Sequence, residues 1–265
     1  MTEWMNGATA FITGGAQGIG LGIARSLARQ GVKLALADID VAALQVAKTE
    51  LAGITPTETF ELDVRDRDAY AAVADKAESA LGPVTLLFNN AGIAPAVPVE
   101  KAEYRHWDWA MGINLNGVYN GIQTFVPRMI ERGQGGYVVN TASGAGLVGG
   151  PGFLYTTSKF AVVGLSESLR MELDGHRIGV SVLCPGPVDT QIIGNTINHS
   201  ETGSSKAPHD KVEFLKAGVS IDAVGDMVLA GMESRQMWIH TDGIMRPHVK
   251  TRMEALLESI PQSAV

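Results

Sequence analysis

Residues 13–20 read Thr13-Gly14-Gly15-Ala16-Gln17-Gly18-Ile19-Gly20, and an interpretation of the whole chain can begin from them. The apolar run Thr9 to Thr13 predicts a strand before them, and Leu21 to Gln30 has the periodicity of a helix after them. Glycines permit a tight turn and close approach of the backbone to a ligand, while the first turn of a helix offers free N–H groups to an anion. The stretch therefore predicts a phosphate-binding turn, with a purely structural glycine turn as the alternative.

Short apolar runs alternate with longer helical stretches along most of the chain. This alternation is typical of repeated strand–helix–strand units around a parallel sheet whose strands are covered on both faces. We expect strands at Thr9–Thr13, Lys33–Ala37, Glu58–Leu62, Thr85–Phe88, Tyr137–Asn140, Gly179–Leu183 and Met237–His240. Because no linker or internal repeat interrupts the pattern, residues 1–265 are predicted to form one doubly wound α/β domain, with a mostly parallel seven-stranded sheet flanked by helices.

Composition narrows the function classes. The 265 residues are 45% hydrophobic and 18% charged, and the formal net charge is −7, which argues against a protein that binds nucleic acid through its phosphates. One cysteine, Cys184, is too few for an intramolecular disulfide or a cysteine-based zinc site, and the six histidines are scattered, so we predict no metal site. The chain shows neither a signal peptide nor an apolar run long enough for a membrane span, so we expect a cytoplasmic protein without a membrane partner.

The predicted second strand is followed directly by Asp38, about 20 residues beyond the glycine turn. An acidic residue at this position can hydrogen-bond the ribose hydroxyls of an adenine dinucleotide. A 2′-phosphate there would meet a like charge, and neither Gln17 nor Ile39 supplies a compensating cation. The sequence thus favours NAD over NADP. Asp38 is also a candidate cap for a helix that begins near Val41, and the two roles are compatible.

Four further stretches are spaced along the same pattern. They are Asn89-Asn90-Ala91-Gly92, Asn114, Ser143 with Tyr155-Thr156-Thr157-Ser158-Lys159, and Pro185-Gly186-Pro187-Val188-Asp189-Thr190. In this order and spacing they resemble the short-chain dehydrogenase/reductase family over nearly the whole chain. The resemblance implies a Rossmann-type fold and hydride transfer between an alcohol or ketone and a nicotinamide cofactor.

Tyr155 and Lys159 are four residues apart, so on a helix they share one face. A lysine charge favours a phenolate, and lowering a tyrosine pKa from about 10 to near 7 requires about 4 kcal/mol. The lysine together with the positive ring of oxidised nicotinamide could supply that energy. The resemblance implies that Tyr155 is the acid/base, that Ser143 holds the substrate oxygen and that Asn114, in a helical stretch from Glu103 to Ile130, anchors a water beside Lys159.

The spacing of the catalytic serine departs from the family pattern. Ser143 precedes Tyr155 by twelve residues, where the family more often has thirteen, which suggests a shortened loop through Gly149-Gly150-Pro151. Thr141 is the alternative, but it lies nearer the predicted strand. Ser143 is therefore the better candidate.

The resemblance also assigns cofactor contacts. Asp63 and Val64 are implied at the adenine, and Asn90 is implied at the ribose and in holding the sheet together. Residues from Pro185 to Thr190 are implied at the nicotinamide, with Val188 and Thr190 at its carboxamide. The full set of expected cofactor residues is Gly14, Gln17, Gly18, Ile19, Gly20, Asp38, Ile39, Asp63, Val64, Asn90, Ala91, Gly92, Tyr155, Lys159, Pro185, Gly186, Val188 and Thr190.

The polar stretch Gln191–Gly218 is predicted to be a long loop after a strand, either a substrate-binding lid or a surface insertion. An apolar pocket is expected from Leu147, Val148, Phe153, Ile192, Ile193 and Phe214, so we predict an apolar substrate, aromatic or steroid-like. Residues 116–121 and 125–129, with a predicted C-terminal helix at 246–260, are similar to bacterial members that oxidise benzylic alcohols of lignin-derived aryl ethers.

Cys184 is predicted to pack rather than to act as a nucleophile, and Trp107 and Trp109 to pack rather than to take part in recognition. The methionines could line an apolar substrate pocket or fill the core, and core packing is favoured for most of Met227, Met232, Met237, Met245 and Met253. We expect a homodimer or homotetramer, formed through the helices that end near Ile130 and begin near Phe153. The chain lacks the Asp-Gly-Gly ending of many family members, so their tetramer contact is not assumed.

The sequence is less consistent with two other functions. A regulatory protein that binds NAD without turnover is disfavoured because such relatives usually lose the tyrosine or the lysine. An enoyl reductase or dehydratase is disfavoured because the serine, tyrosine and lysine suit carbonyl chemistry.

Overall fold

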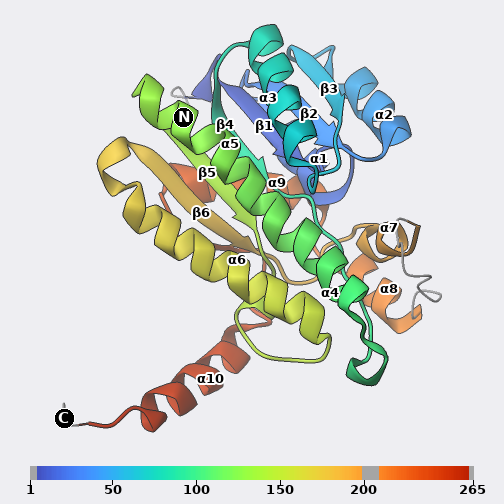
Figure 1. The fold of residues 1–265 in the computed structure, drawn as a ribbon, viewed down its shortest axis with the longest axis vertical. Helices are drawn as coiled ribbons and strands as arrows, with labels where there is room; N and C mark the ends of the chain where they lie inside the picture. Colours follow the sequence, from blue (N-terminus) through green and yellow to red (C-terminus); the bar gives the residue numbers. More distant parts are fainter. Residues whose placement is uncertain (1–4, 199–208, 263–265) are drawn as a thin grey trace.

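The computed structural model describes residues 5–198 and 209–262 and contains one seven-stranded sheet in the order β3-β2-β1-β4-β5-β6-β7 (Figure 1). Every pair of neighbouring strands is parallel. The strands are β1 (Thr9–Thr13), β2 (Lys33–Asp38), β3 (Thr57–Glu61), β4 (Val84–Asn89), β5 (Gly136–Thr141), β6 (Ile178–Cys184) and β7 (Trp238–His240). Each lies within one residue of its predicted bounds, so the prediction of a doubly wound parallel sheet is confirmed.

Helices cover both faces of the sheet. On one face lie α1 (Gly18–Ala28), α2 (Val41–Leu51) and α9 (Ile221–Glu233), and on the other α3 (Arg67–Leu81), α5 (Gly117–Arg132) and α6 (Phe153–Glu172) (Figure 1). Successive residues of one strand serve the two cores, because side chains alternate across a sheet. Phe11 thus packs with α3 and α5, whereas Ile12 packs with α1 and α9.

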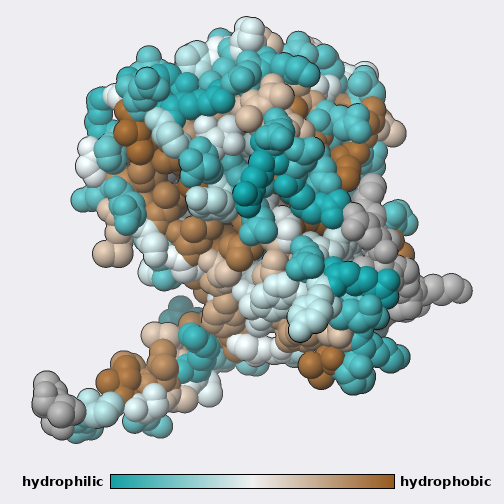
Figure 2. All heavy atoms as spheres, viewed as in Figure 1, coloured by the Kyte–Doolittle hydropathy of each residue, from teal (hydrophilic) through white to brown (hydrophobic). Residues whose placement is uncertain are grey.

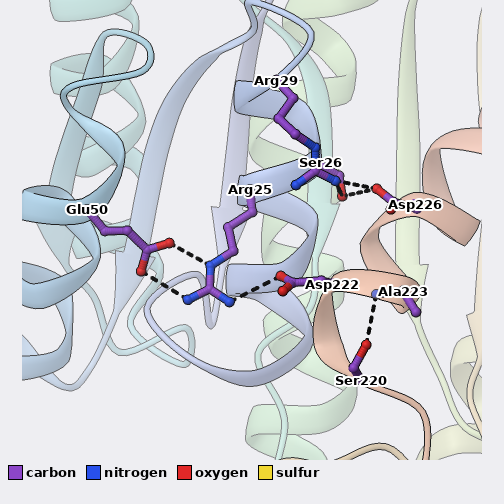
Figure 3. A network of polar contacts seen from close by, with 8 residues as sticks. All are labelled: Arg25, Ser26, Arg29, Glu50, Ser220, Asp222, Ala223 and Asp226. Atoms are coloured by element: carbon purple, nitrogen blue, oxygen red, sulfur yellow. Dashed lines mark hydrogen bonds and ion pairs between the residues drawn. The ribbon is translucent and has the colours of Figure 1, made fainter.

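One interhelical contact, between α1 and α9, is unusually close. A Cβ at Gly225 would overlap the carbonyl oxygen of Gly22, so both glycines are needed for the two backbones to meet. Charged groups border this contact (Figure 3): Arg25 binds Glu50 and Asp222, at 2.6 and 3.1 Å, and Arg29 pairs with Asp226. The contact fixes α9 against the helix that begins at the glycine turn.

The predicted helical stretch from Glu103 to Ile130 is helical throughout, but its central turn is a π-helix. It consists of α4 (Tyr104–Met111), a π-helical turn at Gly112–Asn116, and α5. A capping box between Glu103 and His106 begins α4. A π-turn inserts an extra residue into the helical repeat and is frequent at functional sites. Here it contains Asn114.

The stretch 191–218, predicted as a loop, is partly helical. It contains α7 (Ile192–Asn198) and α8 (His209–Lys216), while residues 199–208 lie outside the described chain. Shorter helical turns occur at η2 (Val99–Lys101), η4 (Gly144–Gly146) and η5 (Asp174–His176). In the described parts of the chain, no helix is long and apolar enough to cross a membrane.

The last helix, α10 (Arg246–Ser259), runs away from the rest of the molecule (Figure 1). None of its residues is buried, and the guanidinium of Arg252 lies 5.1 Å from the ring centre of Phe160 in α6. Apolar side chains are exposed along it, and Figure 2 shows them as brown on the projecting arm. They are Met253, Leu256, Leu257 and Ile260.

Two packing predictions were wrong. Of the five methionines expected mainly in the core, Met232 is buried and the half-buried Met237 packs against a core cluster. Met227 and Met245 are half-buried outside the core clusters, and Met253 is exposed. Trp107 is 43% exposed, because it lies on the outer side of α4, whereas its neighbour Trp109 is buried as predicted.

Candidate active site

A cavity of about 520 Å³ opens at the carboxyl ends of the strands, where the strand order reverses between β1 and β4. The predicted residues that line it are Gly14, Gln17, Gly18, Ile19, Asp38, Ile39, Asp63, Val64, Asn90, Ala91, Gly92, Ser143, Tyr155, Lys159, Pro185, Gly186, Val188 and Thr190. Gly20 and Asn114 are not in the cavity wall. The fold thus brings segments from the whole chain to one cavity.

The glycine turn between β1 and α1 forms one part of the wall. Gly18 has φ of +53°, a conformation that favours glycine, and a Cβ there would lie 3.3 Å from Cγ2 of Thr190. A Cβ at Gly20 would overlap the carbonyl of Gly14, which explains why Gly20 is needed behind the wall. The side chain of Gln17, the N-cap of α1, accepts no hydrogen bond from the first turn. The N-terminus of α1 is thus available to an anion in the cavity.

Asn90 ties this turn to the neighbouring strand. Its side-chain nitrogen donates to the carbonyls of Thr13 and Gly14, each at 3.2 Å, and its backbone N–H donates to the Thr13 hydroxyl at 3.0 Å. Asn90, which follows β4, therefore helps to hold the glycine turn in its conformation. These bonds agree with the role in sheet integrity that the family resemblance implied for Asn90.

Asp38 ends β2 at the same edge of the sheet. Its two carboxylate oxygens accept from the backbone N–H groups of Ala16 and Asp40, both at 3.1 Å. Burial raises the pKa of Asp38, although these hydrogen bonds oppose the shift. The predicted cap role was wrong: Asp40, which accepts from Ala43 at 2.9 Å, caps α2.

Two charged residues that the sequence reasoning missed also line the cavity. The second oxygen of Asp40 accepts from Nε2 of Gln17 at 3.0 Å. Arg65 pairs with Asp63 at 2.7 Å, and this partner lowers the Asp63 pKa against the opposing effect of burial. Because Asp63 lies only two residues before Arg65, the sequence could have suggested this ion pair.

Ser143, Tyr155 and Lys159 converge on the opposite part of the wall. Tyr155 and Lys159 share one face of α6, and Nζ of Lys159 lies 5.7 Å from the centre of the Tyr155 ring. The Ser143 side chain accepts from the Ala145 N–H at 3.1 Å and lies close enough to the Tyr155 hydroxyl to affect its pKa. The rejected alternative, Thr141, instead donates its hydroxyl to Asn90 at 3.2 Å, while its backbone carbonyl accepts from Lys159 Nζ at 3.0 Å.

The ionisation of these groups is dominated by burial. Burial raises the Tyr155 pKa, and the nearby Ser143 side chain only partly offsets the shift. Burial also lowers the pKa of Lys159 to about 8. The net effect of the protein's own groups is thus to raise the pKa of the Tyr155 phenol. The lower pKa expected from the sequence depended on a second positive charge, that of oxidised nicotinamide.

Asn114 lies fully buried in the π-turn. Its Oδ1 accepts from the Ile93 N–H at 2.9 Å, and its Nδ2 donates to the Ile93 carbonyl and the Ser158 hydroxyl, both at 3.0 Å. A Cβ at Gly92 would lie 3.2 Å from Asn114 Oδ1 and 3.3 Å from Lys159 Nζ. Asn114 is thus close to Lys159, with Gly92 leaving the space between them.

Helix α7 closes the cavity from above the glycine turn. Asn195 donates to Oε1 of Gln17 at 3.3 Å, and Thr196 accepts from the Ala94 N–H at 2.9 Å. Asn195 lines the cavity. The sequence reasoning missed both residues because it expected a loop, although the apolar residues at 192, 193 and 197 match a short helix.

The apolar wall differs from the predicted one. It contains Ile93, Trp109, Ile113, Leu215 and Ile221, and from the predicted set only Ile192. Leu147 and Phe153 pack against core clusters, whereas Val148, Ile193 and Phe214 are not in the wall, and Phe214 is 57% exposed. The η4 turn after Ser143 and the helices in 191–218 turn these residues away.

Other groups were considered as reactive or metal-binding. Cys184 is buried, and burial raises the pKa of its thiol to about 12, which suits packing. Within residues 5–198 and 209–262, no three His, Cys, Asp or Glu side chains gather as a metal site would require.

Comparison with known proteins identifies the family. A model of short chain dehydrogenases matches residues 8–201. The chain belongs to this family. This short chain dehydrogenase is 34% identical over 264 residues to a C alpha-dehydrogenase of Sphingobium sp. (strain NBRC 103272 / SYK-6), covering 95% of this chain and 86% of the relative.

A second relative, 3beta-hydroxysteroid dehydrogenase 2 of Eggerthella lenta, is 37% identical over 204 residues, covering 76% of this chain and 78% of the relative. Among solved structures, a short chain dehydrogenase/reductase from Burkholderia phymatum in complex with NAD matches with a TM-score of 0.91 at 31% identity. That match covers 100% of this chain and 99% of the other. The family and its fold are therefore those expected from the sequence.

Proposed function

We propose that this short chain dehydrogenase interconverts an apolar secondary alcohol and its ketone by hydride transfer with NAD. One observation carries the proposal: Ser143, Tyr155 and Lys159 lie in the wall of the same cavity as the uncapped N-terminus of α1. A reacting alcohol and a dinucleotide would thus share one site. The same observation disfavours a regulator without turnover, because it would have no need for the tyrosine and lysine.

The cavity fits NAD better than NADP. The N-terminus of α1 suits a pyrophosphate, and the Asp38 carboxylate suits two ribose hydroxyls but repels a 2′-phosphate. Arg65 pairs with Asp63 rather than with Asp38. The related Burkholderia structure, which is in complex with NAD, supports this choice.

In the proposed mechanism, Ser143 donates a hydrogen bond to the substrate oxygen while Tyr155 removes the alcohol proton. Bound NAD⁺ supplies the hydride acceptor and a positive charge that favours the phenolate. Lys159 adds its own charge from 5.7 Å, and in ketone reduction Tyr155 returns the proton. Asn114 holds the loop at Ile93 and, with Lys159, would bind the water that links the site to solvent.

The proposal also covers the class of substrate and the oligomeric state. The apolar wall favours an aromatic, benzylic or steroid-like alcohol, and the relatives named for a C alpha-dehydrogenase and a steroid dehydrogenase agree with that range. We place α7 and α8, within 191–218, as the substrate-binding segment. We further propose a homodimer or homotetramer and a cytoplasmic location.

The test is a spectrophotometric assay of the wild type and Tyr155→Phe with NAD⁺ or NADP⁺ and a panel of benzylic alcohols, aryl-ether alcohols and hydroxysteroids. We expect turnover with NAD⁺ that falls by at least about 100-fold in the variant, because the acid/base is lost. Circular dichroism of both proteins controls for folding. Faster turnover with NADP⁺ would refute the role given to Asp38, and tight NAD⁺ binding without turnover on any alcohol or ketone would favour the regulator.

A further inference from the structure

Trp109, predicted only to pack, lies in the cavity wall. It is 4% exposed, yet it belongs to none of the described hydrophobic core clusters. Its neighbours in α4, Ala110 and Met111, pack against Leu154, which precedes Tyr155 in α6. Helix α4 thus packs against the start of α6, which carries Tyr155, and Trp109 reaches the cavity wall from that helix.

The indole N–H of Trp109 donates no hydrogen bond to any acceptor in the described residues. Its Nε1 is nevertheless in contact with solvent. Among the described residues, Arg132 Nε is the one buried side-chain polar atom that has neither a hydrogen-bond partner nor solvent contact, so Trp109 Nε1 is not such an atom. By contrast, Nε1 of the half-exposed Trp238 donates to Glu167 at 3.0 Å. Buried indole N–H groups usually have an acceptor, so the cavity is where the acceptor for Trp109 is expected.

We propose that Trp109 is a specificity residue whose N–H binds a second oxygen of the substrate, an ether, hydroxyl or carbonyl group away from the reacting carbon. Ile93, Ile113 and Ile192 of the same cavity wall are apolar and cannot accept a hydrogen bond through their side chains, and no acceptor side chain of the described wall, Asn195 included, pairs with the indole N–H. The substrate is thus an apolar alcohol with an additional acceptor, and the indole ring covers its apolar part. This inference rests on the proposed function, because it requires an alcohol or ketone in the same cavity.

A cofactor hydroxyl is the other possible acceptor. The groups assigned to the cofactor, Asp38 and the N-terminus of α1, come from other elements than α4. We therefore expect Trp109→Phe, which keeps an aromatic ring and removes the N–H, to leave NADH affinity unchanged in a fluorescence titration. A weaker NADH affinity in this variant would overturn the assignment to the substrate.

The deciding experiment compares 1-phenylethanol with its 2-, 3- and 4-methoxy derivatives in the wild type, Trp109→Phe and Trp107→Phe. In the wild type, we expect one methoxy isomer to have a kcat/KM about three- to tenfold above that of the parent alcohol, as a hydrogen bond of ordinary strength would give. Trp109→Phe should remove this advantage through KM. Trp107→Phe, on the exposed side of the same helix, should retain it.

A binding assay separates failure of this inference from failure of the proposed function. Ketones cannot be reduced in the presence of NAD⁺, so calorimetric titration of acetophenone and the methoxyacetophenones into NAD⁺-saturated protein reads affinity without turnover. We expect the same isomer preference, again lost in Trp109→Phe and kept in Trp107→Phe. An advantage of equal size in Trp109→Phe, or no methoxy advantage in the wild type, would overturn the inference even if the enzyme turned over all four alcohols.

Discussion

At the scale of single residues, the sequence predicted most of the expected catalytic and cofactor residues in the cavity wall, but neither its apolar part nor how each side chain is held. Ser143, Tyr155 and Lys159 all line the cavity. They could be predicted because Tyr155 and Lys159 are four residues apart on one helix and Ser143 fits the family pattern. The choice between Asp38 and Asp40 as the cap was wrong because both precede α2 and only the backbone conformation separates them. Trp109 was undervalued because an unpaired N–H becomes visible only when its surroundings are known.

Lys159 is expected to be required for turnover but to lower the stability of the folded protein. Burial lowers its pKa from 10.5 to about 8, so below pH 8 the folded protein holds a charge that is more favourable in the unfolded chain. This cost is complete below pH 8, shrinks between pH 8 and 10.5, and vanishes above that. We expect Lys159→Met to lose turnover yet raise Tm at pH 7 by about 2–4 °C, which is the shift for about 1 kcal/mol in a protein of this size.

Calorimetric melting at pH 7 and pH 9.5 tests this prediction, with the gain in Tm smaller at the higher pH. The lost hydrogen bond from Lys159 to the Thr141 carbonyl opposes the gain at both values, so the change with pH is the informative quantity. A gain that grows with pH would contradict the assigned shift.

At the scale of elements, the strands were predicted to within one residue, whereas interruptions of helices were not. Buried parallel strands are apolar throughout, and this pattern is plain in the sequence. The π-turn at Gly112–Asn116 is held by contacts with another segment, such as the bond between Asn114 and Ile93. Local periodicity cannot reveal such contacts.

The close contact of α1 and α9 gives a prediction at this scale. In Gly225→Ala the added methyl would overlap the Gly22 carbonyl, so the helices must separate. Overpacking of this kind costs about 1–3 kcal/mol and should lower Tm by several degrees. Gly194→Ala in α7, where the nearest atom is 3.7 Å from the new Cβ, is the matched control and should melt within about 1 °C of the wild type. Equal Tm values for both variants would show that the contact is not tight.

At the scale of the whole molecule, exposed apolar side chains are spread over several elements, and two of these places bear on assembly. One is the projecting α10, and the other is the face shared by α5 and α6, where Figure 2 shows an apolar band between the two helices. On α6, Leu165 and Leu169 are half-buried and Met171 is 81% exposed. The sequence reasoning chose this pair of helices for assembly, and their surface is consistent with a second copy packing there.

The proposed assembly predicts the effect of a change at Gly164 in the middle of α6. No atom lies within 4 Å of a Cβ built there, so Gly164→Lys should not disturb the monomer, but its side chain would project from the helix into a packed partner. By light scattering after gel filtration we expect the wild type at twice or four times 28.0 kDa and the variant at a smaller mass. Gly53→Lys, at a position that is equally open and beyond α2, should keep the wild-type mass. A monomeric wild type would remove the proposal of a homo-oligomer, and a variant of unchanged mass would move the interface away from α6.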